Sequence, residues 1–243
     1  MDEMQKMKKE PHSWMIKRVE MYKSIAESDC SSLKKVEFQF ADPEVGWVDM
    51  TVKFDGETVN ELSLTNAWGT DPMRGLLDLM ETNIDSCEIP HYFFHDGERE
   101  AYVFHIEDIV FPGVGHRKEN GHFYSKGIFS LFVHPVSYEA EDELLYAVCD
   151  TTELIASLYS AIRDFAERQK KNDRVAEDWA MDAYQKYWIE MMKKRRQLEQ
   201  IDEAEEIKQI RAIMLKSLRS AKIESFLKER NSYGHRYITY SET

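Results

Sequence analysis

Alternation of apolar and polar side chains is the feature that most constrains how this chain folds. Val36, Phe38 and Phe40 alternate with Glu37 and Gln39, and the same period of two recurs over residues 48–54, 89–95 and 102–106. Further strands are expected over residues 59–64 and 122–134. Successive side chains of a strand point to opposite faces of a sheet, so a period of two with one polar face indicates half-buried strands. The sequence therefore predicts an antiparallel β-sheet of about six strands.

Turn and cap signals divide these strands. Asp55-Gly56 predicts a hairpin, because glycine adopts at little cost the positive φ that a tight turn requires. At Asp71-Pro72 the apolar spacing changes to three and four residues, which predicts a helix over about 72–84 with Asp71 as its N-cap. This helix is expected to cross the sheet with one apolar stripe, formed by Met73, Leu76, Leu77, Met80 and Ile84.

Helical spacing also marks both ends of the chain. A short helix is predicted over residues 13–27, and residues 144–148 are either a last strand or the entry to a helix. Asp150 and Glu153 then have the spacing of a capping box, and three helices are predicted over about 150–169, 174–200 and 202–226. In the helix predicted over residues 13–27, the side chains expected to face inward are those of Met15, Val19, Tyr22 and Ile25.

Together these elements predict an α+β fold with two parts. Residues 1–150 form an acidic sheet domain of about six antiparallel strands with one crossing helix. Residues 151–243 form a three-helix region, whose apolar stripes must be buried on the sheet, on each other or on a second copy of the chain. Self-association through these C-terminal helices is therefore one of the predictions.

Acidic residues are concentrated in the first part. Residues 1–150 hold 29 acidic against 14 basic residues, a net −15, whereas residues 151–243 hold 16 against 18, a net +2, and together they give the chain its net charge of −13. A field of negative sign repels nucleic acid and anionic membranes and attracts basic proteins. The sequence therefore predicts a basic protein as partner, and neither nucleic acid nor a membrane.

Cysteine usage and hydropathy indicate the compartment. The three cysteines, Cys30, Cys87 and Cys149, are far apart and odd in number, which is typical of free thiols in a reducing environment. The first twenty residues lack the continuous apolar core of a secretory signal, and no segment approaches eighteen apolar residues. A cytoplasmic protein is expected.

Motifs for catalysis or cofactor binding are missing from the sequence. There is no GxSxG elbow, no Walker pattern and no complete GxGxxG, so no cofactor is expected. Histidines cluster between residues 91 and 134, and His91, His95 and His105 on neighbouring strands could hold zinc or another transition metal. Because no tightly spaced ligand motif is present, strand histidines without a metal are favoured, and a metal-dependent hydrolase is the alternative.

Acidic and aromatic side chains are the candidates for contact with a partner. On the predicted sheet we expect partner-facing carboxylates at Asp49, Glu57, Glu61, Asp96, Glu98 and Glu100. In the helical region, Trp179 and Trp188 cannot easily share one narrow stripe, so an exposed remainder would mark an interface. Catalytic residues are not expected.

One segment is similar to a known group of proteins. The run Trp68-Gly-Thr-Asp71-Pro72-Met-Arg-Gly-Leu76-Leu77 and its flanking strands, about residues 45–108, resemble small intracellular bacterial proteins of the toxin-immunity type. The resemblance implies an acidic protein that sequesters a basic toxin. We therefore expect a non-enzymatic, immunity-like binding protein, with the metal-dependent hydrolase and a regulatory or structural dimer built on the helical tail as alternatives.

Overall fold

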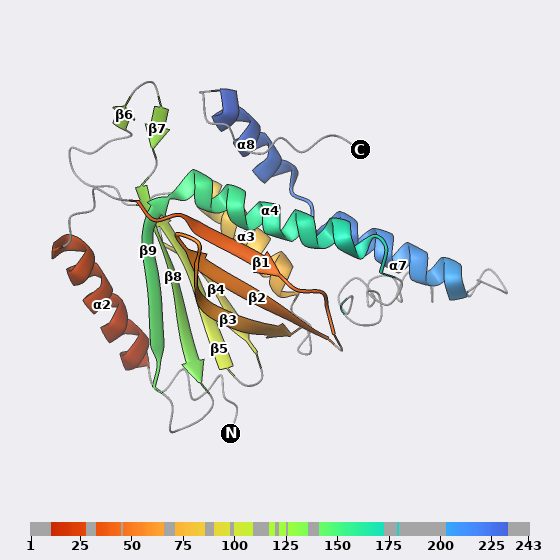
Figure 1. Ribbon diagram of the computed structural model, residues 1–243, viewed down its shortest axis with the longest axis horizontal. Coiled ribbons are helices and arrows are strands. Elements are labelled where there is room, and N and C mark those ends of the chain that lie inside the picture. The colour runs from red at the N-terminus through yellow and green to blue at the C-terminus, as the bar shows by residue number, and fades with distance from the viewer. Residues whose placement is uncertain are drawn as a thin grey trace.

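The computed structural model has an α+β architecture (Figure 1). It describes residues 11–27, 33–44, 46–65, 71–85, 90–97, 100–108, 117–119, 122–124, 126–135, 141–172, 179 and 203–232. The helices described are α2 (Pro11–Glu27), α3 (Pro72–Asp85), α4 (Thr151–Gln169), α7 (Glu203–Ser217) and α8 (Ala221–Ser232). The strands described are β1 (Val36–Phe40), β2 (Trp47–Phe54), β3 (Glu57–Thr65), β4 (His91–Asp96), β5 (Glu100–Asp108), β6 (Arg117–Glu119), β7 (His122–Tyr124), β8 (Lys126–Pro135) and β9 (Glu143–Asp150).

The strands form two main antiparallel sheets, where the sequence predicted one of about six strands. A three-stranded sheet has the order β1-β2-β3, a four-stranded sheet has the order β4-β5-β8-β9, and β6 and β7 pair separately. At the end of β3 the backbone N–H of Thr65 donates to the His95 side chain on β4. The two sheets therefore meet at this point through a side chain, and alternation of residues carries no signal for such a boundary.

Local turn chemistry follows the sequence. Asp55 and Gly56 have φ values of 52° and 85°, so the predicted hairpin between β2 and β3 is present and uses the left-handed backbone region at both positions.

Residues 143–150 are strand β9, which settles the choice between a last strand and a helix entry. The segment before β1 reaches β9, because the Lys34 N–H donates to the Val148 carbonyl at 2.8 Å.

Both predicted helix caps are present. The Asp71 carboxylate accepts from the backbone N–H groups of Met73 and Arg74 at the start of α3. The Asp150 carboxylate accepts from the N–H groups two and three residues later, at 2.8 and 3.0 Å, at the start of α4. Each cap satisfies N–H groups that have no partner inside the helix.

A shared apolar core joins the two sheets to α3 and α4. The Phe129 ring on β8 lies 5.3 Å from the ring of Phe38 on β1 and 6.4 Å from that of Phe54 on β2. The α3 residues Met73, Leu76, Leu77 and Met80 and the α4 residues Leu154, Leu158, Ile162 and Phe165 belong to the same cluster. The first part of the predicted helical region is therefore packed on the sheets.

Glycine allows α3 to approach β4 closely. A Cβ atom added at Gly75 would lie 2.1 Å from the Phe93 ring, so a side chain there would require the ring or the helix to shift. Gly75 and the cap Asp71 both belong to the run that resembles toxin-immunity proteins, while Trp68 lies outside the described residues. The described part of this run therefore serves the docking of α3.

Two helical predictions differ from the structure. The helix predicted over 202–226 is divided into α7 and α8, because the Ser220 hydroxyl accepts from the Ile223 N–H and begins a new helix, while the Ser220 N–H donates to Tyr159. The helix predicted over 174–200 lies outside the described residues except for Trp179. In α2 the predicted inward stripe is wrong in part: Met15 and Val19 are about half exposed, and Met21 is buried instead.

Candidate functional site

The outer face of the three-stranded sheet, here called the open face, is acidic. Val48, Met50 and Val52 of β2 point into the core, which leaves Asp49 and its alternate neighbours on the outer side. Asp49 is opposite Ser63 and Thr51 is opposite Glu61 in the β2–β3 register, so Asp49 and Glu61 are diagonal neighbours on one face. In Figure 1 no labelled helix is drawn in front of β2 or β3.

The open face also carries one lysine of β2, since Lys53 lies opposite Glu37 of β1. Asp49 accepts from the Ser63 hydroxyl at 2.6 Å, and Glu37, on the same face of β1, pairs with Lys35 at 2.6 Å. Within the described part of the chain, neither Asp49 nor Glu61 forms an ion pair. Two carboxylates predicted to bind a partner are therefore adjacent, exposed and available.

Cations of the C-terminal part pair with other carboxylates. Arg168 of α4 lies 3.3 Å from Asp42, and Lys222 of α8 lies 2.6 Å from Asp85. Asp42 lies close to β2, since the N–H of the preceding Ala41 donates to the Asp49 carbonyl, but the Arg168 side chain pairs with Asp42 and not with Asp49. Among the described residues of the C-terminal part, none forms an ion pair with Asp49 or Glu61.

The other predicted carboxylates lie elsewhere. Glu57 is opposite Phe54 at the end of the β2–β3 hairpin, so it does not share the outer side with Asp49. Asp96 ends β4 and Glu100 begins β5, at the tip of the next hairpin. Glu98 lies outside the described residues. The predicted set is therefore divided between the open face and two hairpin ends.

Tyr102 connects the open face with the β4–β5 hairpin. Its hydroxyl donates to the Glu100 carboxylate at 2.9 Å. Burial raises the pKa of Tyr102, and the hydrogen bond to Glu100 and the nearby charge of Asp49 raise it further. Tyr102 therefore stays protonated at neutral pH and lies within the field of carboxylates from both sheets.

His95 is buried beside Tyr102 and links the two sheets through a hydrogen bond. Its side chain is only 3 % exposed, and Nε2 accepts from the Thr65 N–H at 3.2 Å. Burial lowers the pKa of His95 to about 4, and the charge of Asp96 offsets this only in part. Because Nε2 accepts, the proton of the neutral ring is on Nδ1, which has no hydrogen-bond partner among the described residues.

The three histidines of the metal alternative do not share a face. His91 and His95 are opposite Ile106 and Tyr102 on the inner side of the four-stranded sheet, whereas His105 is opposite Tyr92 on the outer side. Among the residues that the structure describes, no three His, Cys, Asp or Glu side chains are grouped so that they could hold a metal ion. The geometry gives the hydrolase alternative no metal centre on these residues.

The outer face of the four-stranded sheet, here called the covered face, lies under α2. Met21 and Ile25 of α2 pack there against Ile128 of β8, in a small cluster separate from the main core. Figure 1 shows α2 alongside β9. Beneath the helix, Tyr92 stacks on His105 with ring centroids 4.8 Å apart.

Arg18 of α2 is inserted into this face, which the sequence reading missed. Its guanidinium carbon lies 5.6, 5.3 and 5.1 Å from the ring centroids of Trp14, Tyr22 and Tyr92. Arg18 donates to the Tyr22 hydroxyl at 3.0 Å, and Tyr22 in turn donates to the carboxylate of Glu107. We call Tyr92, His105 and Glu107 of the sheet the arginine site. The spacing of Trp14, Arg18 and Tyr22, one helical turn apart, is the sequence signal that could have indicated it.

Electrostatics favour a cation in the arginine site. Burial alone would raise the pKa of Glu107, but contacts with His105, Tyr22 and Arg18 bring it below its usual value, so the carboxylate is charged. Burial lowers the pKa of His105, which keeps the imidazole neutral, and raises the pKa of Tyr22 to about 12, as does its hydrogen bond to Glu107. Glu107 thus supplies a negative charge, and Tyr22 relays it to the guanidinium.

Ser130, His105 and Glu107 also have the order of contacts found in a hydrolase triad. The Ser130 hydroxyl lies 3.1 Å from His105 Nδ1, and His105 Nε2 lies 3.3 Å from Glu107. Ser130, however, is buried within β8, which pairs with β5 on one side and β9 on the other. Backbone N–H groups of such a central strand are used in the ladders and leave no oxyanion hole. The geometry therefore favours a packing role.

Trp179 does not form the exposed surface that was predicted for it. Its side chain is 2 % exposed and lies edge-on to Phe165 of α4, with ring centroids 6.4 Å apart. This large ring therefore belongs to the main apolar core and is not available to a partner. Trp188 lies outside the described residues.

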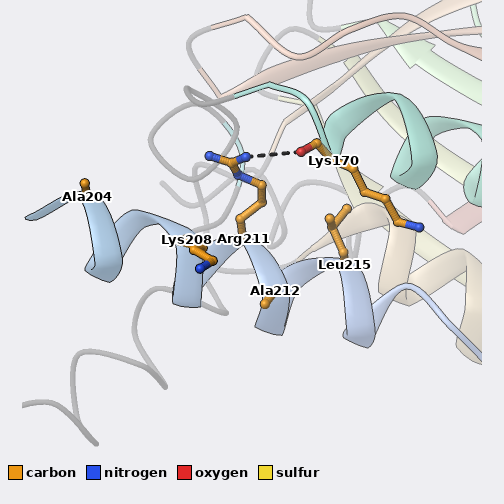
Figure 2. A pocket seen from close by; sticks show the side chains of 6 residues that line it. All are labelled: Lys170, Ala204, Lys208, Arg211, Ala212 and Leu215. Atoms are coloured by element: carbon orange, nitrogen blue, oxygen red, sulfur yellow. Dashed lines mark hydrogen bonds between the residues drawn. The ribbon is translucent and has the colours of Figure 1, made fainter.

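A basic hollow lies where α4 ends beside α7 (Figure 2). It has a volume of about 460 Å³, and its lining residues are Lys170, Ala204, Lys208, Arg211, Ala212 and Leu215. The cations already have partners, since Lys170 pairs with Glu167 at 2.6 Å, Lys208 pairs with Glu205 at 3.6 Å, and Arg211 donates to the Lys170 carbonyl at 3.1 Å. The hollow therefore has less free charge than its composition indicates.

Comparison with known protein families, curated proteins and solved structures found no match to this chain. Among the described helices, none is long and apolar enough to span a bilayer. What the chain does must therefore be inferred from its own surfaces.

Proposed function

We propose that this chain is a non-enzymatic binding protein whose open face binds a basic protein, in the manner of an immunity protein that covers a basic toxin. The supporting observation is that Asp49 and Glu61 are exposed side by side on a rigid sheet without an ion pair among the described residues. A cytoplasmic location belongs to the same proposal.

The physical basis is electrostatic complementarity. Charges held on paired strands have fixed positions, so they favour one docking orientation over others. A net charge of −13 also attracts a basic partner at long range and speeds association, and this effect weakens as salt rises. The partner is accordingly expected to present lysine or arginine side chains to β2 and β3.

The experiment compares two charge reversals of equal size. In one variant, Asp49→Lys and Glu61→Lys reverse the open face. In the matched control, Glu20→Lys and Asp164→Lys reverse two exposed carboxylates on α2 and α4. Because both variants change the net charge equally, they separate the position of the charge from its total.

Proteins retained from a cell extract by the immobilised chain are identified, and the affinity of each purified protein is then measured for all three chains. We expect a basic protein that the wild type and the control bind alike and that the open-face variant binds at least tenfold more weakly. Equal loss in both variants, or no loss in the open-face variant, would contradict the proposal.

A further inference from the structure

Helix α2 turns an arginine toward the sheet and apolar side chains toward solvent. Met15, Ile16 and Val19 are 54 %, 54 % and 52 % exposed, whereas the Nε atom of Arg18 is buried. A surface helix normally does the reverse, because burying its apolar stripe drives its packing. The face that α2 turns to the sheet therefore combines two buried apolar side chains, Met21 and Ile25, with the guanidinium of Arg18.

The sheet offers an aromatic surface next to a negative charge. Tyr92 and His105 form a stacked pair across β4 and β5, and Glu107 lies two residues beyond His105 on the same face. An arginine side chain packs its flat guanidinium over an aromatic ring and donates hydrogen bonds toward a carboxylate, here through Tyr22. This is the chemistry of a guanidinium-binding site.

The contacts that hold helix α2 lie outside the main apolar core. Its buried apolar side chains, Met21 and Ile25, belong to the small cluster of the covered face and not to the main core. Trp14 of α2 also lies edge-on to Tyr92 and Phe94 of β4, with ring centroids 5.4 and 6.3 Å apart. The polar contacts are Ser13, which donates to Asp142, and Tyr146, which donates to Ser24 at 2.8 Å. Release of α2 would leave the described main core intact.

We propose that the arginine site is a second binding site, specific for an arginine-bearing amphipathic helix of a partner protein, and that α2 is its internal occupant. The ligand helix carries aromatic side chains one turn before and one turn after its arginine, as Trp14 and Tyr22 flank Arg18. The arginine site is on the four-stranded sheet and the open face is on the three-stranded sheet. The proposal for the arginine site is therefore independent of the function proposed above.

The test uses the full-length chain and a fluorescent synthetic peptide of residues 11–27 as the probe. Arg18→Ala in the chain weakens the internal occupant, and we expect this chain to bind the peptide at least tenfold more tightly than the wild type does. Glu107→Gln added to Arg18→Ala should remove most of that gain. Lys23→Ala, which removes an exposed cation from the same helix, is the matched control and should give no gain.

A second peptide, with alanine in place of the arginine at position 18, tests the chemistry. It should bind to the Arg18→Ala chain at least tenfold more weakly than the natural peptide. If Arg18→Ala does not fold, Tyr22→Phe interrupts the relay to Glu107 with a smaller change and should give a gain of severalfold. Equal binding of the two peptides, or equal affinity of the natural peptide for wild-type and variant chains, would overturn the proposal.

Discussion

The open face and the covered face are both outer faces of antiparallel sheets, but their carboxylates differ in whether they interact with a cation of the same chain. On the covered face, Glu107 lies beneath α2 and interacts with Arg18 through Tyr22. On the open face, Asp49 and Glu61 remain exposed, and no described cation pairs with them. The comparison shows that one carboxylate is part of the folded structure, whereas the other two are available to a partner.

This difference has an energetic side. Burying Met21 and Ile25 of α2 against the sheet contributes about 1.5–3 kcal/mol for each side chain. The hydrogen bonds that join Arg18, Tyr22 and Glu107 depend on one another, so loss of one member weakens the others. Exposed carboxylates such as Glu61 contribute little to stability, because water screens them. Conservative changes on the two faces should therefore have unequal effects on the free energy of unfolding.

The largest effect is expected where the two sheets share their core. Phe129→Ala should lower the free energy of unfolding by about 3–5 kcal/mol, because it removes a buried ring that contacts both β1 and β2. Urea denaturation followed by fluorescence measures this, with the exposed Phe94→Ala as control at under about 1 kcal/mol. Two separate unfolding transitions in the variant would show that the faces belong to independent units.

Acid should weaken the joint between the sheets through His95. The pKa of the folded residue is lowered from 6.5 to about 4, so the unfolded chain takes up a proton that the folded chain does not. The stability due to neutral His95 is complete above about pH 6.5 and is lost as pH falls toward 4, by up to about 3 kcal/mol. His95→Gln keeps an acceptor for Thr65 and should flatten the curve of unfolding free energy against pH. An unchanged curve would exclude His95 as the cause.

The sharpest contrast between the faces comes from one substitution made on each. Glu107→Gln should cost about 1–2 kcal/mol, less than a fully buried pair, because Glu107 is 22 % exposed and glutamine can still accept from Tyr22. Glu61→Gln should change stability by no more than about 0.5 kcal/mol. Equal costs, measured by urea denaturation at neutral pH, would remove the distinction drawn between the two faces.

Local signals in the sequence predicted much of the fold. The caps at Asp71 and Asp150 and the Asp55-Gly56 hairpin are decided by residues within one turn of each other, and the structure has all three. The division into two sheets was not predicted, because it depends on which distant strands pair. His95, which meets the end of β3, is thirty residues from Thr65.

The candidate site shows the same limit. Alternation in β2 correctly predicted that Asp49 faces outward, but placing Glu61 beside it needs the register of β3. Arg18 was missed because apolar spacing alone was used to choose the inward face of the helix, and a cation that packs on aromatic rings gives no signal in that spacing. Trp179 was misassigned because the width of an apolar stripe does not indicate what packs on it.

Mapping a basic probe onto the chain tests the central claim most directly. A lysine- and arginine-rich peptide is titrated into the isotope-labelled chain while backbone amide chemical shifts are recorded at low and at physiological salt. The account predicts the largest shifts around Asp49, Ser63 and Glu61, with Tyr92 and His105 unaffected while α2 occupies the arginine site. Shifts spread evenly over all acidic residues, or absent from β2 and β3, would contradict it.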